Sequence, residues 1–217
     1  MVMSISTVPA TTFAAPPTVR RGRVGPPSVG VDLVAAEDAG RAFLRALGID
    51  PDSTATPDLA RTPRRFAEAY AELLTSESFD FTTFENTEGY DEMVIVGGIP
   101  VQSVCEHHLL PFTGTAHVGY LPAGRVVGLS KIPRMVNHFA RRPQTQERLT
   151  VQIADALVAH LAPQGVGVVV EAVHTCMTLR GVRAGAAATR TSAVRGILRD
   201  DPRSRAEFFS LAGHTSH

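Results

Sequence analysis

Several features are scarce or missing in the 217-residue chain, and each absence excludes a class of protein. No apolar run reaches the length needed to cross a bilayer, so the chain is not expected to enter a membrane. Neither sign of charge is in excess, since Lys+Arg and Asp+Glu both total 21, which argues against a general binder of nucleic acid or membrane surfaces. No continuous apolar core stands near the N-terminus, so we expect a cytoplasmic protein without a signal peptide.

Cysteine and lysine are scarce as well. The chain has only Cys105 and Cys176, which would form a disulfide in a secreted protein and metal ligands or reactive thiols in a cytosolic one. Without an export signal, the second interpretation is favoured. Lys131 is the only lysine among 21 basic residues, which indicates either a position that needs a compact ammonium or a chance survivor.

The chain divides into three regions. Residues 1–31 contain two proline pairs and no regular apolar pattern, which predicts a disordered tail. Residues 32–90 predict an N-terminal helical region, with helices over 32–47 and 62–74. Residues 91–217 carry the motifs with chemical meaning and form the expected catalytic region.

The catalytic region predicts the order hairpin, helix, helix, hairpin. The expected elements are strands at 93–96, 101–105, 114–121 and 125–127, helices at 132–139 and 149–161, strands at 165–174 and 187–197, and a last helix at 202–211. Gly97 and Gly98 predict a bulge between the first two strand segments. A sheet this small leaves two open edges, which pairing with other copies of the chain would cover.

A metal site is predicted from the two cysteines and their neighbours. In Cys105-Glu106-His107-His108, a thiol and an imidazole stand three residues apart, a spacing at which a turn can direct both onto one ion. Cys176 supplies a second thiolate from a later strand. Two thiolates and one imidazole favour zinc, and three protein ligands leave a fourth position for water, as in catalytic sites.

The neighbouring histidines are candidates for chemistry. His174 and Cys176 have the same parity, so on one continuous strand they would lie on one face, together with Arg180 if the strand extended that far. His107 is adjacent to a ligand without being needed as one, and is therefore a candidate general acid. For each histidine alone, the alternative is an ordinary structural role.

An anion site is predicted without the usual phosphate-binding motifs, which are absent from the chain. Ser130 can cap a helix whose first turn contains Pro133, and Lys131 and Arg134 stand three residues apart on one face of that helix. A helix N-terminus with two cations suits a phosphate chain. The alternative is an ordinary cap beside solvated charges.

Gln146 and Glu147 are expected in the first turn of the next helix. A glutamate there either stabilises the helix through the macrodipole or accepts two N–H bonds from a flat ligand such as guanine. Spacing does not choose between these roles.

Four motifs, taken together and in order, closely resemble type I GTP cyclohydrolase. The motifs are Cys105-Glu106-His107-His108, Gly128-Leu129-Ser130-Lys131, the run from Arg142 to Thr150, and the run from His174 to Gly181. The resemblance covers roughly Asp32 to Leu211.

This resemblance implies an α+β tunnelling fold. In that fold an antiparallel sheet with two helices on one face, in the order ββααββ and preceded by N-terminal helices, joins the sheets of other subunits into a barrel, typically in a toroidal homodecamer with active sites at subunit interfaces. The implied reaction converts GTP and water to 7,8-dihydroneopterin triphosphate and formate, the first step of tetrahydrofolate and pterin biosynthesis. The implied cofactor is Zn²⁺, which activates water for attack on C8 of guanine.

The resemblance also implies a role for each matched position. The zinc ligands would be Cys105, His108 and Cys176. The catalytic residues would be His107, which protonates the imidazole ring nitrogen, and His174 and Ser130, which act in ring opening and the later ribose rearrangement. The substrate contacts would be Gln146 and Glu147 for guanine and Lys131, Arg134, Arg180 and a neighbouring subunit's Arg65 for the triphosphate.

The chain departs from the family pattern at two places. Glu68 stands three residues after Arg65, where the family usually has a basic residue, and a carboxylate there would repel a triphosphate unless it turns away. Residues 183–190 lack the Lys-Pro-Gly that commonly follows the second ligand motif.

Two other functions remain open from the sequence. The first is a nitrile reductase of the same fold, which acts on a deazapurine with NADPH and requires a nucleophilic cysteine free of zinc. The second is a catalytically silent, zinc-stabilised assembly protein. The intact His107 and His174 argue against the silent form.

Overall fold

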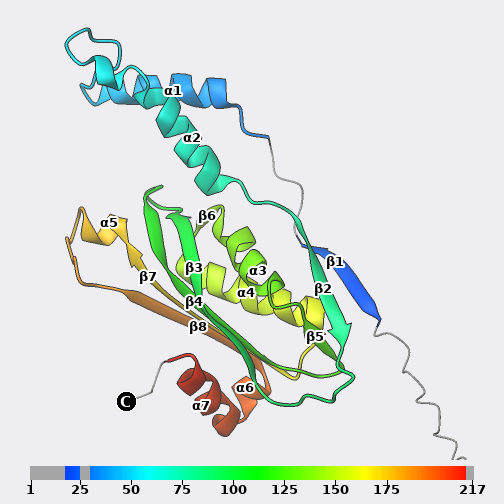
Figure 1. Ribbon diagram of the computed structural model, residues 1–217. Helices are drawn as coiled ribbons and strands as arrows, with labels where there is room; N and C mark the ends of the chain where they lie inside the picture. Colours follow the sequence, from blue (N-terminus) through cyan, green and yellow to red (C-terminus); the bar gives the residue numbers. More distant parts are fainter. Residues whose placement is uncertain (1–17, 25–29, 214–217) are drawn as a thin grey trace, which may run out of the picture.

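The computed structural model describes residues 18–24 and 30–213 (Figure 1). Its helices are α1 Leu33–Ala46, the 3₁₀ turn Pro57–Leu59, α2 Thr62–Leu74, α3 Lys131–Ala140, α4 Gln146–Leu161, α5 Thr175–Thr178, α6 Ile197–Asp200 and α7 Pro202–Leu211. Its strands are β1 Val19–Val24, β2 Phe79–Glu85, β3 Val94–Cys105, β4 Pro111–Leu121, β5 Arg125–Val127, β6 Pro143–Gln144, β7 Gly165–His174 and β8 Thr189–Gly196. Within the described ranges, no helix is long and apolar enough to cross a membrane.

One curled sheet forms the centre of the molecule. Its strand order is β6-β3-β4-β7-β8, and the four long strands pair antiparallel with their neighbours, whereas short β6 runs parallel to β3. α3 and α4 cover one face (Figure 1). The register of β3 against β4 shifts between Val96 and Ile99, so the predicted bulge at the glycine pair is confirmed. The predicted mixture of α and β structure is confirmed as well.

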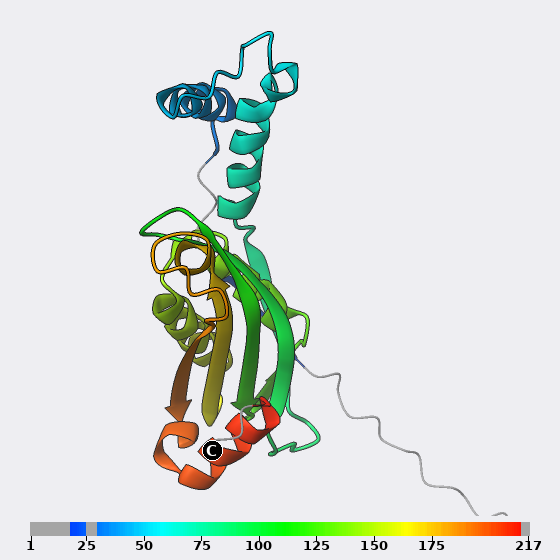
Figure 2. The same ribbon diagram turned by 90° about the vertical axis from the view of Figure 1, so that its left-hand side faces the viewer.

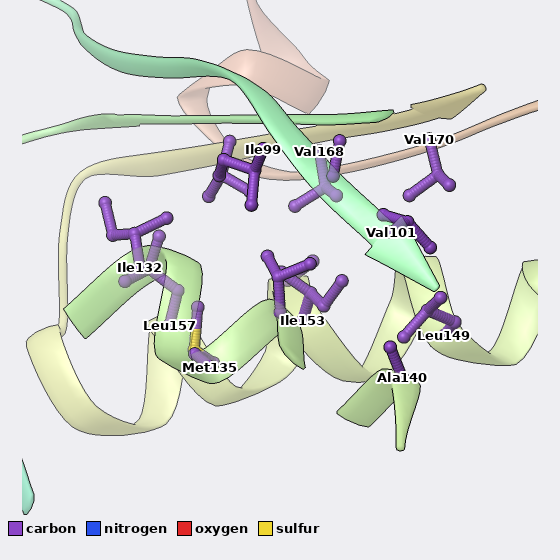
Figure 3. Close-up of a cluster of buried hydrophobic side chains, with 14 of the residues drawn as sticks. Ile99, Val101, Ile132, Met135, Ala140, Leu149, Ile153, Leu157, Val168 and Val170 are labelled. Carbon is purple, nitrogen blue, oxygen red and sulfur yellow. The ribbon is translucent and has the colours of Figure 1, made fainter. Parts of the chain in front are cut away.

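The main core lies between this sheet and the two helices. β3 contributes Ile99 and Val101, whereas α3 and α4 contribute Ile132, Met135, Leu149, Ile153 and Leu157 (Figure 3). These side chains follow strand alternation on β3 and helical spacing on α3 and α4, which is why both helices were predictable. Leu149, at the first turn of α4, places that end of the helix firmly against the sheet.

α7 covers part of the opposite face of the sheet. Its Phe208 is fully buried against Gly119 of β4 and Gly167 of β7, where an added Cβ would stand 2.9 and 2.7 Å from the ring. The two glycines therefore leave the room that the ring occupies. This small second core anchors the C-terminal end of the described chain far from α1 and α2 (Figure 2).

A second sheet, β1-β2-β5, corrects the predicted hairpin and the predicted helical region. β5 does not continue the β4 hairpin but pairs with β2, with Val126 opposite Phe84. Asn86, just after β2, holds the turn between β4 and β5 beside β2. Its backbone N–H donates to the Gly124 carbonyl (3.0 Å), and its side-chain amide donates to the Ala123 carbonyl (3.0 Å). Residues 32–90, expected to be helical, thus also contain a strand.

The expected disordered tail also differs at one point. Residues 19–24 form β1 along the edge of β2, from Val19 opposite Phe84 to Val24 opposite Phe79. Main-chain groups supply this pairing, so it needs no apolar pattern in the Val-Arg-Arg-Gly-Arg-Val segment. Residues 1–17 and 25–29 lie outside the described residues, and the domain boundaries at 31 and 90 stay predictions.

α1 and α2 form a helical hairpin beyond one end of the central sheet (Figures 1 and 2). Asp32 caps α1 by accepting the Val34 and Ala35 N–H groups at 3.1 and 3.0 Å. α2 spans the predicted residues, and Arg61, at its N-cap, makes no side-chain cap bond. α2 contacts β3, and in its later turns Tyr70 bonds the Leu109 carbonyl and the Glu72 carbonyl accepts from Arg141.

Candidate metal centre

Cys105 and His108 lie on a tight loop, residues 105–110, between β3 and β4. Cys105 is the last residue of β3, and its N–H donates to the Leu110 carbonyl at 2.9 Å. Its own carbonyl accepts the Leu109 N–H at 2.8 Å. The two bonds close the loop and turn the side chains of Cys105 and His108 to the same side.

Cys176 reaches the same place from a different element than predicted. β7 ends at His174, and Cys176 lies on the one-turn helix α5, so the prediction that both residues share one strand face is wrong. The chain bends after His174 because Thr175 begins α5, with its hydroxyl bonded to the Pro111 carbonyl at 2.6 Å. The sulfur atoms of Cys105 and Cys176 nevertheless lie close together.

Cys105, His108 and Cys176 form a group able to hold a metal ion. Their ligand atoms all lie within 4.8 Å of one another, and neither cysteine is in a disulfide. The Cys105 Sγ lies 3.8 Å from the His108 Nδ1 and equally 3.8 Å from the His107 Nδ1. Burial, and then the neighbouring Cys105 thiol, raise the pKa of Cys176. A soft cation would offset this crowding of thiols, and two sulfurs with one imidazole fit zinc.

A cavity of about 230 Å³ opens over this group. It is lined by Cys105, His107, His108, Gln144, Thr145, Gln146, Glu147, His174, Cys176, Met177 and Thr189. The structure thus brings the predicted ligands, both candidate catalytic histidines and the predicted base-reading pair around one space.

Gln146 fixes the orientation and the tautomer of His174. Its side-chain nitrogen donates to the carbonyls of Val170 (3.0 Å) and Thr189 (2.9 Å), which can only accept. Its oxygen therefore faces the His174 Nε2, 2.8 Å away, and that nitrogen must carry the proton. In neutral His174, the lone pair is then on Nδ1.

The ring of His174 is held on its face as well. It stacks on Phe112 of β4, with ring centroids 4.4 Å apart and planes 13° from parallel. Burial lowers the pKa of His174, and the nearby Glu147 carboxylate opposes this shift only in part. The lowered pKa favours the neutral imidazole, which Gln146 and Phe112 hold in place, and no sequence pattern indicated Phe112 as its support.

An ion pair that the sequence did not indicate ties the 105–110 loop to α4. Arg148 bonds the Glu106 carboxylate and also donates to the Gln144 side chain (2.9 Å) and the Pro143 carbonyl (2.9 Å). Gln144 in turn bonds the Phe139 carbonyl. The guanidinium of Arg148 thus joins the 105–110 loop, β6 and α4. Arginine can do this because its guanidinium carries several N–H donors.

The predicted cationic residues lie elsewhere on the chain. Lys131 and Arg134 line a separate hollow of about 460 Å³ with Glu77, Ser78, Phe79, Asp80 and Asn137. Ser130 is the N-cap of α3, but its side chain makes no cap bond and does not line the cavity over Cys105. Arg65 and Arg180 are exposed. Within one chain, the two cysteines and the two cations of α3 therefore line different hollows.

Glu68 turns toward its own helix. Its carboxylate accepts from the Arg64 Nε at 2.6 Å, and Arg64 also lies 3.7 Å from Glu37 of α1. The carboxylate is thus paired one turn away on the face of Arg64, and the neighbouring Arg65 is left without it. The role of Arg65 as a triphosphate contact stays a prediction.

Comparison with known proteins identifies the family of the chain. A family model described as GTP cyclohydrolase I matches residues 36–213. The chain is 54% identical to the GTP cyclohydrolase 1 of Mycobacteroides abscessus over 189 residues, 85% of this chain and 91% of that protein. It is 50% identical to the GTP cyclohydrolase 1 of Carboxydothermus hydrogenoformans over 190 residues, 86% and 97% of the two chains. Among solved structures, the apo archaeosine synthase QueF-Like is similar, with a TM-score of 0.40 and 21% identity over 48% of this chain and 93% of that one.

Proposed function

Because the chain belongs to the GTP cyclohydrolase I family and is an enzyme of that activity, we propose that its reaction takes place in the cavity over Cys105, His108 and Cys176. The observation that carries this proposal is the convergence of three metal-ligating atoms within 4.8 Å of one another, beside two histidines that are not needed as ligands. GTP and water enter, and 7,8-dihydroneopterin triphosphate and formate leave.

Zinc is the ion that these residues would hold. When bound, it would lower the pKa of a coordinated water and so supply a nucleophile near neutral pH. With both sulfurs in the ligand group, the chain keeps no separate cysteine for the covalent chemistry of a nitrile reductase.

The two histidines divide the proton transfers. His107 lies at the rim of the cavity, with a side chain 65% exposed, and delivers a proton to the imidazole ring nitrogen of guanine. His174 accepts a proton at Nδ1 during ring opening, because Gln146 holds the proton of its Nε2. Positioned acids and bases of this kind typically contribute about 10²–10⁴-fold to a rate.

The guanine base is read chiefly by Glu147. Its exposed carboxylate belongs to the cavity lining and can accept two N–H bonds from the edge of the base. The neighbouring Gln146 is 2% exposed, and its amide is already bonded to two carbonyls and to His174. Its side chain therefore contributes to base recognition through His174 rather than by direct contact.

The triphosphate is bound between copies of the chain. Lys131 and Arg134 line a hollow of their own, so they serve the thiol cluster best when a second copy brings its α3 beside the first copy's cavity. Ser130 would arrive with them, Arg65 would come from α2 of a neighbouring copy, and Arg180 lies close enough to Cys176 to favour its thiolate. We propose a homo-oligomer, a decamer in which the sheets join into a barrel.

A mixing experiment tests the shared site. Lys131→Ala and Cys176→Ala oligomers are dissociated, mixed in equal amounts and reassembled. If each site takes its cysteines from one copy and its lysine from another, about a quarter of the sites in a random mixture are intact, and activity rises from near zero to about that fraction of the wild type. Activity that stays at the level of the unmixed variants contradicts a shared site.

The reaction itself is tested on the wild-type protein. Purified protein is expected to contain about one zinc per chain, from the ligand count, and to release formate from GTP. Dialysis against a chelator should remove the zinc and abolish formate release. Added zinc should restore the zinc content and the activity. Metal-loaded protein that gives neither formate nor, after oxidation, a fluorescent pterin would reject the proposed reaction.

A further inference from the structure

A strained residue directly follows one of the metal-binding side chains. Leu109, next to His108, has a φ of +52°, one of three non-glycine residues with positive φ in the described part of the chain. A left-handed conformation brings Cβ close to the following carbonyl and is unfavourable for leucine but not for glycine. The direction of His108 depends on this turn, so something must hold Leu109 in it.

Part of the restraint comes from outside the 105–110 loop. Tyr70, in the last turns of α2, donates its hydroxyl proton to the Leu109 carbonyl at 2.8 Å. The ring of Tyr70 packs on Phe66 of the same helix, with centroids 4.8 Å apart, so the hydroxyl starts from a fixed position. Both aromatic residues line one apolar hollow of about 670 Å³ together with His108 and Leu109.

The two bonds on either side of Leu109 act together. The Leu109 N–H is bonded to the Cys105 carbonyl within the loop, and the Leu109 carbonyl is bonded to Tyr70. With both ends of the residue fixed, the peptide that joins it to Leu110 cannot rotate back to an unstrained conformation. Without Tyr70, only the loop's own bonds oppose that rotation, and His108 loses its fixed direction toward Cys105.

We propose that Tyr70 is a positioning residue for the metal: its hydroxyl holds Leu109 left-handed and thereby keeps His108 aimed at Cys105 and Cys176 before the ion binds. The inference rests on the proposed zinc site and adds a residue to it. It also links the α1–α2 hairpin, which carries Arg65, to the affinity of the metal centre.

Zinc affinity, measured by competition with a chromogenic chelator, tests this role. Tyr70→Phe keeps the ring but removes the donor, and is expected to weaken zinc binding about fivefold, the loss of one hydrogen bond of about 1 kcal/mol. Tyr90→Phe is the matched control, because it removes a hydroxyl from a 48% exposed tyrosine outside the metal centre, and it should bind zinc as the wild type does.

Substitutions of Leu109 test the strain without touching Tyr70. Glycine accepts the left-handed conformation, so Leu109→Gly in the Tyr70→Phe background is expected to restore most of the lost zinc affinity. Leu109→Val, with a β-branched side chain at a 48% exposed position, is expected to weaken zinc about fivefold or more in an otherwise folded protein.

The outcomes separate clearly. Equal zinc affinity of Tyr70→Phe and wild type overturns the proposal, even if thermal stability falls, because Tyr70 would then only support α2. A loss that Leu109→Gly does not repair also overturns it. A wild-type protein that binds no zinc rejects the metal centre itself, whereas a wild type that binds zinc but does not turn over GTP leaves the role of Tyr70 intact.

Discussion

Cys176→Ala is expected to lose zinc at micromolar chelator and to release formate from GTP about a thousandfold more slowly than the wild type, or slower. A catalytic metal ion typically contributes several kcal/mol, and each 1.36 kcal/mol is a factor of about ten in rate. Even residues that only orient a ligand cost about 10–100-fold in metal affinity when removed, and Cys176 would supply a ligand atom itself. Metal analysis and a formate assay on the same preparation measure both effects.

The stability of this variant gives a second measurement. Zinc held only by the folded chain should raise the unfolding temperature of the wild type, whereas Cys176→Ala should unfold at the same temperature with and without zinc. Thr178→Ala, in the same one-turn helix α5, controls for damage to the helix and should keep the zinc response. A full complement of zinc in Cys176→Ala would mean that His107 or a carboxylate replaces it and that the ligand set is wrong.

The convergence of Cys105, His108 and Cys176 was predictable because residue type carries most of the information. The chain has two cysteines, and each stands within three residues of a histidine, so few other ligand sets exist. The argument from strand parity placed Cys176 near His174 by a wrong route, since the chain turns into α5 directly after His174. The predicted element for Cys176 was wrong, but the predicted proximity of its sulfur to Cys105 was correct, because the turn into α5 still directs the sulfur toward Cys105.

The support of His174 could not be predicted, because it depends on register between distant segments. Gln146 bonds Val170 and Thr189, which are 24 and 43 residues away, and it reaches them only because β7 and β8 pair in one register beside α4. A first-turn glutamine has no local signature for this role. The same holds for Tyr70 and Leu109, 39 residues apart.

The second sheet shows two different limits. β2 carries a readable alternation, since Phe81 and Thr83 are buried at 1% and 2% exposure, and the strand could have been found from its sequence. β1 could not, because an Arg-rich segment gains its place by main-chain bonds to an edge that the sequence did not reveal. Whether such a segment forms a strand depends on its pairing with a distant strand rather than on its own composition.

His107→Ala is expected to slow formate release by about 10²–10⁴-fold while retaining about one zinc per chain, the effect of removing a general acid but not a ligand. Either histidine could be the ligand beside Cys105, because the His107 and His108 Nδ1 atoms are both 3.8 Å from the Cys105 Sγ. Only His108 also comes within reach of Cys176, so His108→Ala should lose the metal whereas His107→Ala should not. Zinc loss in both variants, or in His107→Ala alone, would assign His107 as a ligand and leave the proton transfer to another group.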